Sequence, residues 1–294
     1  MERLKTRIIV NPFSGTSSKE DFEFLLQSRI DQHRFDYEIC YTTRAGHATT
    51  LSEEAKNSGF QVIVAVGGDG TVNEIANPLI GSDVILGILP GGSGNGFAMH
   101  LGLGRDTIKA IDALNKLHII RVDTCEVNDQ NFVNVSGIGF DARVAYLTKT
   151  NKKRGFWQYF LTTIREANKF EPTKMTIEGS FGKMTGRFAA VAVANASMYG
   201  YNFTIAPTAA LDDGLLDIML IKESSILDYA LLAPRFLNKT LHQSRIVESY
   251  QTDHVRITLE KEDYFHIDGE GFQAPRQLDF RIHPKSLSVI GVKP

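Results

Sequence analysis

The sequence predicts an α/β protein with two domains, an N-terminal doubly wound, mostly parallel α/β domain and a C-terminal antiparallel, β-rich, sandwich-like domain. Its 294 residues exceed what one hydrophobic core usually serves. Up to about residue 125, short β-branched runs alternate with helical patterns, which is the order of a parallel sheet with helices on both faces. Beyond that residue, strand-like runs follow one another through turns, which is typical of antiparallel sheets.

The first domain is placed at residues 1–125. Strands are predicted at residues 7–10, 36–42, 61–66 and 84–89, and helices at 19–33, 48–58, 71–79 and 107–117. Asn11-Pro12 ends the first strand, Leu26 and Ile30 share a face of the first helix, and Gly59 closes the second helix as its C-cap. The third strand is an unbroken apolar run, as expected of a parallel strand buried on both faces.

The second domain is placed at residues 126–285, and about residues 286–294 are candidates to pack back on the first domain. Strands are predicted at residues 132–136, 174–178, 187–194, 216–221, 254–259 and 280–283, and helices at 156–169 and 226–237. Turn-separated strands of this kind indicate antiparallel pairing.

Composition excludes several classes of protein. Apolar residues make up 43% and charged residues 22% of the chain, and the net charge of −2 gives no field that would gather nucleic acid. Cys40 and Cys125 lack metal-ligand spacing and are expected to be reduced thiols, which favours a cytoplasmic protein. The apolar runs fall far short of the ~18 residues that span a bilayer. Any membrane contact is therefore expected to be peripheral.

The strongest chemical signal is the run GGDGTVNE at residues 67–74, directly after the third strand. Its glycines allow close backbone approach to a phosphate, and the following helix offers its N-terminal amides. Asp69 would repel phosphate unless it works through Mg²⁺ or on an acceptor hydroxyl. The alternative is a tight strand-to-helix turn in which the aspartate is only a cap.

Two further turns end neighbouring strands. LPGGSGNGFA at residues 89–98 follows the fourth strand and includes the hydroxyl of Ser93, and Asn11-Pro12-Phe13-Ser14-Gly15 follows the first. Neither Gly-rich turn fits the P-loop or the dinucleotide-binding fingerprint. Because ligands of parallel sheets bind at the carboxyl ends of the strands, all three turns are expected to line one crevice.

Together these segments resemble the diacylglycerol kinase and sphingosine kinase superfamily, in its bacterial lipid kinase form. The resemblance covers essentially the whole chain. It continues at Thr42 with Gly46-His47-Ala48, at Asp123, at Ala206-Pro207, at the run LDDGLLD of residues 211–217, and at Asp268-Gly269-Glu270. GGDGT alone would not be specific, since NAD kinases and phosphofructokinases resemble it there.

The resemblance implies an ATP-dependent lipid kinase with its active site in the interdomain cleft. The γ-phosphate of MgATP would pass to the hydroxyl of diacylglycerol, a sphingoid base or a related lipid. Glu270 would be the catalytic base, and Asp69 would help to bind Mg²⁺ and engage the acceptor. The implied nucleotide-binding residues are Asn11, Pro12, Ser14, Gly15, Thr42, Gly67, Gly68, Asp69, Gly70, Thr71, Val72, Asn73 and Ser93.

The resemblance also implies two metal positions. Asp213, with the carbonyls of Ala210 and Leu215, matches a structural Mg²⁺ site, although Asp212-Asp213 also fits an ordinary acidic turn. Asp69 and Asp123 would belong to a second, Mg²⁺–water network.

Two departures leave alternatives open. Gly96 stands where bacterial members usually carry an aspartate of the Mg²⁺–water network, and Thr16 stands where many carry a lysine. A soluble-substrate kinase of the NAD kinase type and a catalytically silent nucleotide-binding regulator are therefore kept as alternatives.

The sequence leaves the partners partly open. The expected partner is a lipid substrate at a membrane surface, within phospholipid biosynthesis, and a homodimer stays open. Lys152-Lys153-Arg154 beside the aromatic run at 156–160 fits peripheral membrane contact, but the pattern fits better a solvated charge run before an inward-packing helix.

Overall fold

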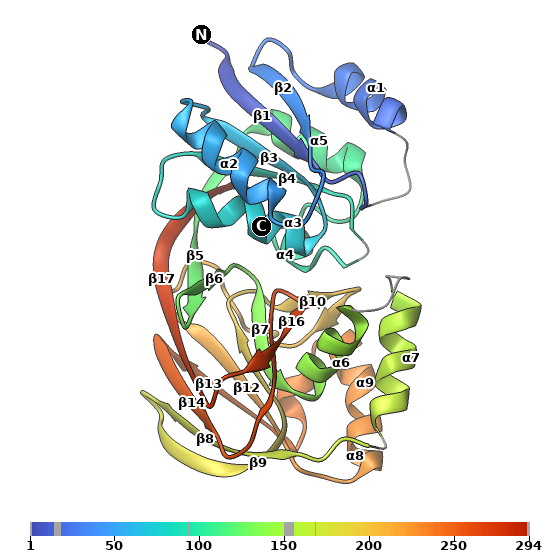
Figure 1. The fold of residues 1–294 in the computed structure, drawn as a ribbon, viewed down its shortest axis with the longest axis vertical. Helices are drawn as coiled ribbons and strands as arrows, with labels where there is room; N and C mark the ends of the chain where they lie inside the picture. Colours follow the sequence, from blue (N-terminus) through green and yellow to red (C-terminus); the bar gives the residue numbers. More distant parts are fainter. Residues whose placement is uncertain (1, 15–18, 93, 150–155, 168, 293–294) are drawn as a thin grey trace. The chain divides into compact units, whose positions relative to one another are not determined.

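The computed structural model describes residues 2–14, 19–92, 94–149, 156–167 and 169–292, and the chain divides into two compact units (Figure 1). The first unit comprises Met1–Val122 with Lys285–Pro294, and the second comprises Asp123–Pro284. The predicted fold class is confirmed, because the first unit contains a parallel sheet and the second is antiparallel and rich in strands.

Five parallel strands form the sheet of the first unit. Their order is β17-β4-β3-β1-β2, with bounds β1 Leu4–Val10, β2 Phe35–Tyr41, β3 Val62–Gly67, β4 Ile85–Pro90 and β17 Gln277–Ile290. Only the end of β17 takes part, where Ser288 lies beside Ile85. All six residues of β3 are buried, as expected of a central strand covered on both faces.

Helices cover both faces of this sheet. The helices are α1 Lys19–Arg29, α2 His47–Asn57, α3 Asp69–Ala76, α4 Gly96–His100 and α5 Thr107–Lys116, with a 3₁₀ turn at Asn77–Leu79. Leu26 of α1 and Ile111 of α5 share a core cluster with Ile8 of β1. The next residue of β1 towards the N-terminus, Arg7, points to the opposite face and donates to the Leu51 carbonyl of α2 at 3.2 Å.

The second unit is built mainly from antiparallel strands. Their bounds are β5 Ile119–Val127, β6 Gln130–Phe132, β7 Val135–Gly139, β8 Thr173–Gly179, β9 Gly182–Ala194, β10 Met198–Gly200, β11 Phe203–Thr204, β12 Leu216–Lys222, β13 Val247–Thr252, β14 His254–Leu259, β15 Asp263–Ile267 and β16 Glu270–Ala274. The main path is β16-β15-β7-β9-β8-β14-β17, and β13-β12 joins it at β9. Phe132 and Phe280 meet edge to face in its core, with 6.3 Å between ring centroids.

Among the described residues of the second unit, four helices and a 3₁₀ turn occur. They are α6 Phe140–Lys149, α7 Phe156–Ala167, α8 Ile226–Ala230, α9 Leu232–Leu237 and the 3₁₀ turn Leu241–Gln243. The predicted single helix at 226–237 is wrong, because it is two helices that meet at Leu231. Pro234 has no N–H to donate to the Ala230 carbonyl four residues earlier, which explains the break.

Other element bounds also differ from the prediction. The strand expected at 132–136 is interrupted between β6 and β7, the helix expected at 19–33 ends at Arg29, and 280–283 is only the middle of β17. Helices α4 and α6 were not predicted. Within the described residues, no helix combines the length and the apolar character needed to cross a bilayer.

Candidate functional site

The strand order of the first unit locates a candidate binding position. The chain leaves β1 for β2 on one side, whereas β3 and β4 lie on the other side of β1. In doubly wound sheets, ligands bind outside the carboxyl ends of the strands at the point where the order reverses. Here that point lies between β1 and β3, which end at Val10 and Gly67.

The turn after β1 is tied to the turn after β3. The Asn11 side-chain amide donates to the Thr71 hydroxyl at 3.0 Å, and the Asn11 backbone amide donates to the Val66 carbonyl at 2.9 Å. Thr42, which is buried, donates its backbone amide to the Val10 carbonyl at 2.9 Å. Three residues predicted from the sequence to bind a nucleotide, Asn11, Thr42 and Thr71, therefore lie at the ends of neighbouring strands.

The two Gly-rich turns lie backbone against backbone. The Gly91 amide donates to the Gly67 carbonyl at 2.9 Å, and a Cβ on Gly92 would lie 2.4 Å from the Gly68 Cα. A Cβ on Gly91 would lie 3.6 Å from the Ser14 hydroxyl, so the turn after β1 reaches the same place. The three turns therefore converge, and glycine is required at Gly92 by this close approach.

Asp69 is the first residue of α3 and is half-buried. Its Oδ1 accepts the backbone N–H of Phe97, in the first turn of α4, at 3.3 Å. Asn95 holds the second Gly-rich turn, because its side chain accepts from the Gly92 amide at 3.1 Å and donates to the Gly92 carbonyl at 2.6 Å. The carboxylate of Asp69 thus faces the turn that begins α4.

The last residue of the first Gly-rich motif, Glu74, has a structural role that the sequence analysis missed. Its two carboxylate oxygens accept the backbone amides of Gly46 at 3.0 Å and Ala48 at 3.2 Å, where α2 begins. A carboxylate at a helix N-terminus satisfies unpaired amides and complements the helix dipole. The Nδ1 atom of His47, the first residue of α2, accepts the Thr43 amide at 3.1 Å.

In the second unit, Glu270 stands directly after a two-residue hairpin turn. Asp268 and Gly269 connect β15 to β16 with φ values of 47° and 85°. Asp-Gly is the sequence that favours such turns, because both positions need positive φ. Glu270 is the first residue of β16, lies opposite Ile267, and its side chain is exposed.

Asp268 anchors this turn, a role that the sequence analysis did not assign. Its carboxylate is buried and accepts three backbone amides, those of Val133 at 3.1 Å, Asn134 at 3.0 Å and Val135 at 3.1 Å. The amides of Val133 and Asn134 belong to the link between β6 and β7, and Val135 begins β7, so the carboxylate binds the chain where the predicted strand is interrupted. The position of Glu270 along the hairpin is therefore fixed by bonds to a segment about 135 residues earlier.

A buried polar network lies behind the hairpin. The imidazole Nε2 of His266 is 3.2 Å from Oδ2 of Asp141, and the Tyr199 hydroxyl donates to the same oxygen at 2.6 Å. The Gly269 amide is 3.4 Å from the Nδ1 atom of His266, so the network reaches the turn. A Cβ on Gly271 would lie 2.3 Å from the backbone nitrogen of Tyr146, so α6 packs directly on β16.

The predicted structural metal ligands share one loop in the second unit. Asp213 is exposed and its Oδ1 accepts the Leu215 amide at 3.0 Å. Asp123, fully buried, accepts the Gly214 amide at 2.8 Å and donates its own amide to the Leu211 carbonyl. Asp123 therefore holds the loop that contains Asp213.

The chemistry of this loop fits a hard cation. Burial raises the pKa of Asp217, hydrogen bonds from Thr208 and Gln251 lower it, and the nearby carboxylate of Asp213 raises it; the net shift is upward. Carboxylate and carbonyl oxygens are the ligands that Mg²⁺ and Ca²⁺ prefer. No cluster of three or more histidine, cysteine, aspartate or glutamate side chains with metal-binding geometry occurs in the described part of the chain.

Some of the predicted residues lie outside the part of the chain that the structure describes. They are Gly15, Ser93 and the Lys152–Arg154 cluster. Asp69 belongs to the first unit, whereas Asp123 and Glu270 belong to the second, so their joint action stays a prediction.

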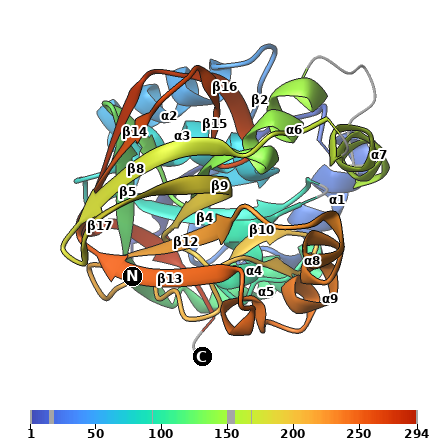
Figure 2. The ribbon, with the colours of Figure 1, turned by 90° about the horizontal axis from the view of Figure 1, so that it is seen from below.

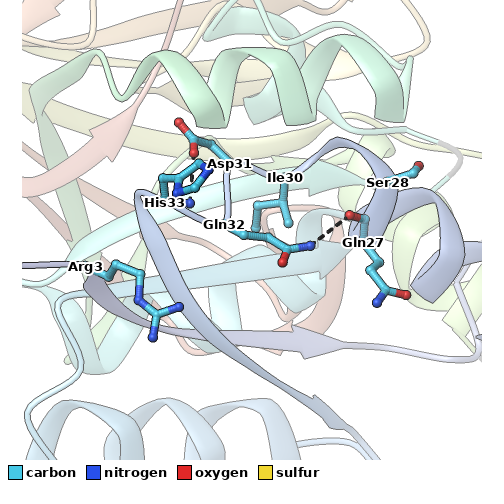
Figure 3. A pocket seen from close by; sticks show the side chains of 7 residues that line it. All are labelled: Arg3, Gln27, Ser28, Ile30, Asp31, Gln32 and His33. Atoms are coloured by element: carbon cyan, nitrogen blue, oxygen red, sulfur yellow. Dashed lines mark hydrogen bonds between the residues drawn. The ribbon is translucent and has the colours of Figure 1, made fainter.

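A shallow depression of about 570 Å³ on the first unit lies away from the candidate site (Figure 3). Asp31 and His33 precede β2, and Arg3 precedes β1, so the depression lies at the amino ends of the strands. The three turns lie at the carboxyl ends. The depression is lined by Arg3, Gln27, Ser28, Ile30, Asp31, Gln32 and His33.

Two family models together match almost the whole chain. The model of the diacylglycerol kinase catalytic domain matches residues 5–127, and the model of the YegS C-terminal NAD kinase beta sandwich-like domain matches residues 134–291. Both matches agree with the segments on which the resemblance was based.

Individual proteins show the same similarity. The diacylglycerol kinase of Bacillus subtilis (strain 168) is 28% identical over 271 residues, which cover 90% of this chain and 89% of that protein. A Chromohalobacter salexigens protein named "Probable lipid kinase YegS-like" is 30% identical over 235 residues, covering 78% and 76%. The crystal structure of a diacylglycerol kinase from Bacillus anthracis str. Sterne has the same fold, with a TM-score of 0.77 at 23% identity and coverage of 99% and 98%.

Proposed function

The chain belongs to the diacylglycerol kinase family and is a kinase, and from this premise we propose that it transfers the γ-phosphate of MgATP to the hydroxyl of a membrane lipid. Diacylglycerol is the first acceptor to test, because relatives of similar length are named diacylglycerol kinases. A sphingoid base or a related lipid is the alternative acceptor.

The observation that carries this proposal is the convergence of three turns at the carboxyl ends of β1, β3 and β4. Gly68 and Gly92 bring the two Gly-rich turns into backbone contact, and Asn11 reaches Thr71. A phosphate chain bound there would meet backbone amides and the N-terminus of α3. We assign ATP to the residues that the resemblance implies in this region, which are Asn11, Pro12, Ser14, Gly15, Thr42, Gly67–Asn73 and Ser93.

The chemistry is divided between the two units. Phosphoryl transfer needs little covalent help from a protein, but it needs charge neutralisation and a positioned nucleophile. Glu270, exposed at the start of β16, would accept the proton of the lipid hydroxyl and orient its oxygen. Asp69, at the start of α3, would engage the acceptor from the nucleotide-binding unit.

Magnesium would be held by carboxylates that the structure already orders. As the resemblance implies, Asp69 and Asp123 would belong to a Mg²⁺–water network, and Asp213, with the carbonyls of Ala210 and Leu215, would hold a structural ion. When bound, Mg²⁺ neutralises phosphate charge. Thermal unfolding of wild type and Asp213→Ala with and without Mg²⁺ tests the structural ion, because bound metal stabilises only the protein that can hold it. Equal stabilisation of both proteins would remove this assignment.

The test of the function is an assay with radiolabelled ATP and a panel of acceptors. The panel contains diacylglycerol, monoacylglycerol, sphingosine, ceramide and phosphatidylglycerol in mixed micelles, and NAD in solution. Labelled lipid supports the proposal. Labelled NADP alone would indicate a kinase of the NAD kinase type, and ATP binding without transfer would indicate a silent regulator.

The same assay tests the role of Glu270. Glu270→Gln should lower kcat by about 10²–10⁴-fold, the usual contribution of general acid–base catalysis, with ATP affinity nearly unchanged. Glu262→Gln is the matched control, because Glu262 is also exposed and precedes the same hairpin. If Glu270→Gln keeps most of its kcat, the base is another residue.

A further inference from the structure

Two short helices of the second unit expose an apolar face. Among the described residues, ten large hydrophobic side chains are exposed, and four of them lie on or beside α8 and α9. Figure 2 shows the two helices next to each other. We call these four the outer face: Ile226 is 62%, Leu227 77%, Leu231 65% and Leu237 54% exposed. A cluster of this kind on a folded surface indicates a binding face.

The outer face is not needed to close the hydrophobic core. The inward side of the same helices packs through Leu232, which is buried, and through Tyr229 and Phe236. The Tyr229 hydroxyl is satisfied as well, because it accepts the Ser224 amide at 2.8 Å and donates to the Lys222 carbonyl at 3.2 Å. The exposed leucines are thus available to a partner.

Basic residues lie next to the outer face in the sequence. From residue 229 to residue 247 the chain has no aspartate or glutamate, and it carries Arg235, Lys239 and Arg245, which we call the basic rim. The acidic residue nearest in sequence, Asp228 on α8, is largely covered and is paired with Arg245 at 2.6 Å. Hydrogen bonds from Ser224, Arg245 and Ser225 hold the pKa of Asp228 well below its usual range. The carboxylate of Asp228 therefore stays ionised and paired with Arg245 of the basic rim.

We propose that the outer face and its basic rim dock the protein on anionic lipid bilayers. Apolar side chains flanked by arginine and lysine are the combination that binds a membrane interface, where the apolar groups enter the headgroup region and the cations meet anionic lipids. A second copy of the chain is a poorer occupant, because a symmetric contact through this face would bring the same cations together. This inference rests on the proposed function, since the acceptor of a lipid kinase resides in the bilayer.

The test measures partition of the whole protein onto sedimented vesicles. The vesicles contain phosphatidylcholine alone or phosphatidylcholine with phosphatidylglycerol. Wild type should bind only the anionic vesicles, and salt should weaken the binding because exposed charges are screened within ~10 Å at 0.1 M. The double variant Leu227→Ser/Leu231→Ser should lower the partition coefficient at least about tenfold, since two leucines no longer leave water. Lys239→Glu should lower it as well.

Matched variants separate docking from general surface effects. Phe24→Ser removes a side chain that is 75% exposed on α1 of the first unit, and Lys109→Glu reverses an exposed charge on α5. Both should bind like wild type. All of the substituted side chains are exposed, so the melting temperature should change little and verifies that each variant is folded.

Activity distinguishes this inference from the proposed function. On monomeric dihexanoylglycerol the leucine variant should match wild type, whereas on long-chain diacylglycerol in anionic vesicles it should be slower. If no lipid is phosphorylated, the proposed function fails but vesicle binding is still measured. The docking proposal is overturned if wild type does not bind anionic vesicles or if the leucine variant binds equally. It is also overturned if the leucine substitutions instead dissociate a dimer seen by size-exclusion chromatography with light scattering.

Discussion

Replacing Asp268 with alanine removes the acceptor of three buried backbone amides. Oδ1 accepts the amides of Asn134 and Val135, and Oδ2 accepts the amide of Val133. The distances lie between 3.0 and 3.1 Å, and Asp268 as a whole residue is only 9% exposed, so water cannot easily take the place of the carboxylate. The amides would be left unpaired in the interior.

The expected cost follows from the number of donors left unsatisfied. Each buried unpaired donor costs about 1–3 kcal/mol, so three give a loss of unfolding free energy of about 3 kcal/mol even at the low end. Asp268→Asn is expected to lose less, because its oxygen can occupy the Oδ1 position and keep two of the three bonds. Its amide then faces the Val133 N–H, so only that donor is lost, at about 1–3 kcal/mol.

Thermal unfolding provides the assay. A loss of 1 kcal/mol lowers Tm by about 2–4 °C in a domain of 150–250 residues, so Asp268→Ala should unfold at least about 6 °C below wild type. Asp253→Ala is the control, because Asp253 is exposed in the turn between β13 and β14 and should shift Tm by less than about 2 °C. The loss of Tm should be largest for Asp268→Ala, smaller for Asp268→Asn and smallest for Asp253→Ala. If Asp268→Ala unfolds within 2 °C of wild type, the three amides do not depend on this carboxylate.

Three further substitutions test separate parts of the structure. Gly92→Ala should weaken ATP binding about tenfold in calorimetry, because its Cβ would lie 2.4 Å from the Gly68 Cα; unchanged affinity would contradict the close approach. Gly271→Ala should lower stability by about 1–3 kcal/mol, because its Cβ would meet the backbone nitrogen of Tyr146 at 2.3 Å; a wild-type Tm would contradict the contact. Burial opposes ionisation of Asp279, but hydrogen bonds from Arg256 and other cations outweigh it and lower the pKa of the carboxyl. The ionised Asp279 carboxylate therefore stabilises the fold above the unfolded pKa of about 4, and this stabilisation is lost as pH falls through the folded pKa. Asp279→Asn should accordingly have a lower Tm than wild type at pH 7, and the difference should shrink at pH 3. A difference in Tm that is the same at both pH values would contradict the lowered pKa.

The sequence predicts best those elements whose signals are local. The unbroken apolar run of β3 predicts a strand buried on both faces, and all of its residues are buried. The meeting of the three turns also follows from the sequence, because parallel strands in one sheet end at the same edge. The break at Leu231 could have been read from Pro234, which cannot donate to Ala230. Helix α6 carries a further signal, since Ala142 and Ala145 are spaced for one buried helix face.

Side-chain bonds between distant segments could not be predicted in the same way. Glu74 lies inside the strongest motif, yet its carboxylate caps α2 rather than facing the Gly-rich turns. Asp268 reaches amides about 135 residues earlier, and those bonds interrupt the strand that the pattern predicts between 132 and 136. Such partners depend on which strands become neighbours, and neither propensity nor periodicity contains that information.

The path of β17 has a consequence for the order in which the protein is synthesised. Its early residues pair with β14 of the second unit, and Ser288 and Val289 pair with β4 of the first. On the ribosome, the first unit therefore emerges with β4 as an open edge, and the strand that covers it is translated only after the whole second unit. Unpaired edges of parallel sheets invite association with other chains. A fragment that ends near Val122 lacks the strand that covers β4 and should therefore aggregate. A circular permutant that places residues 285–292 before β1 would instead have this strand translated first.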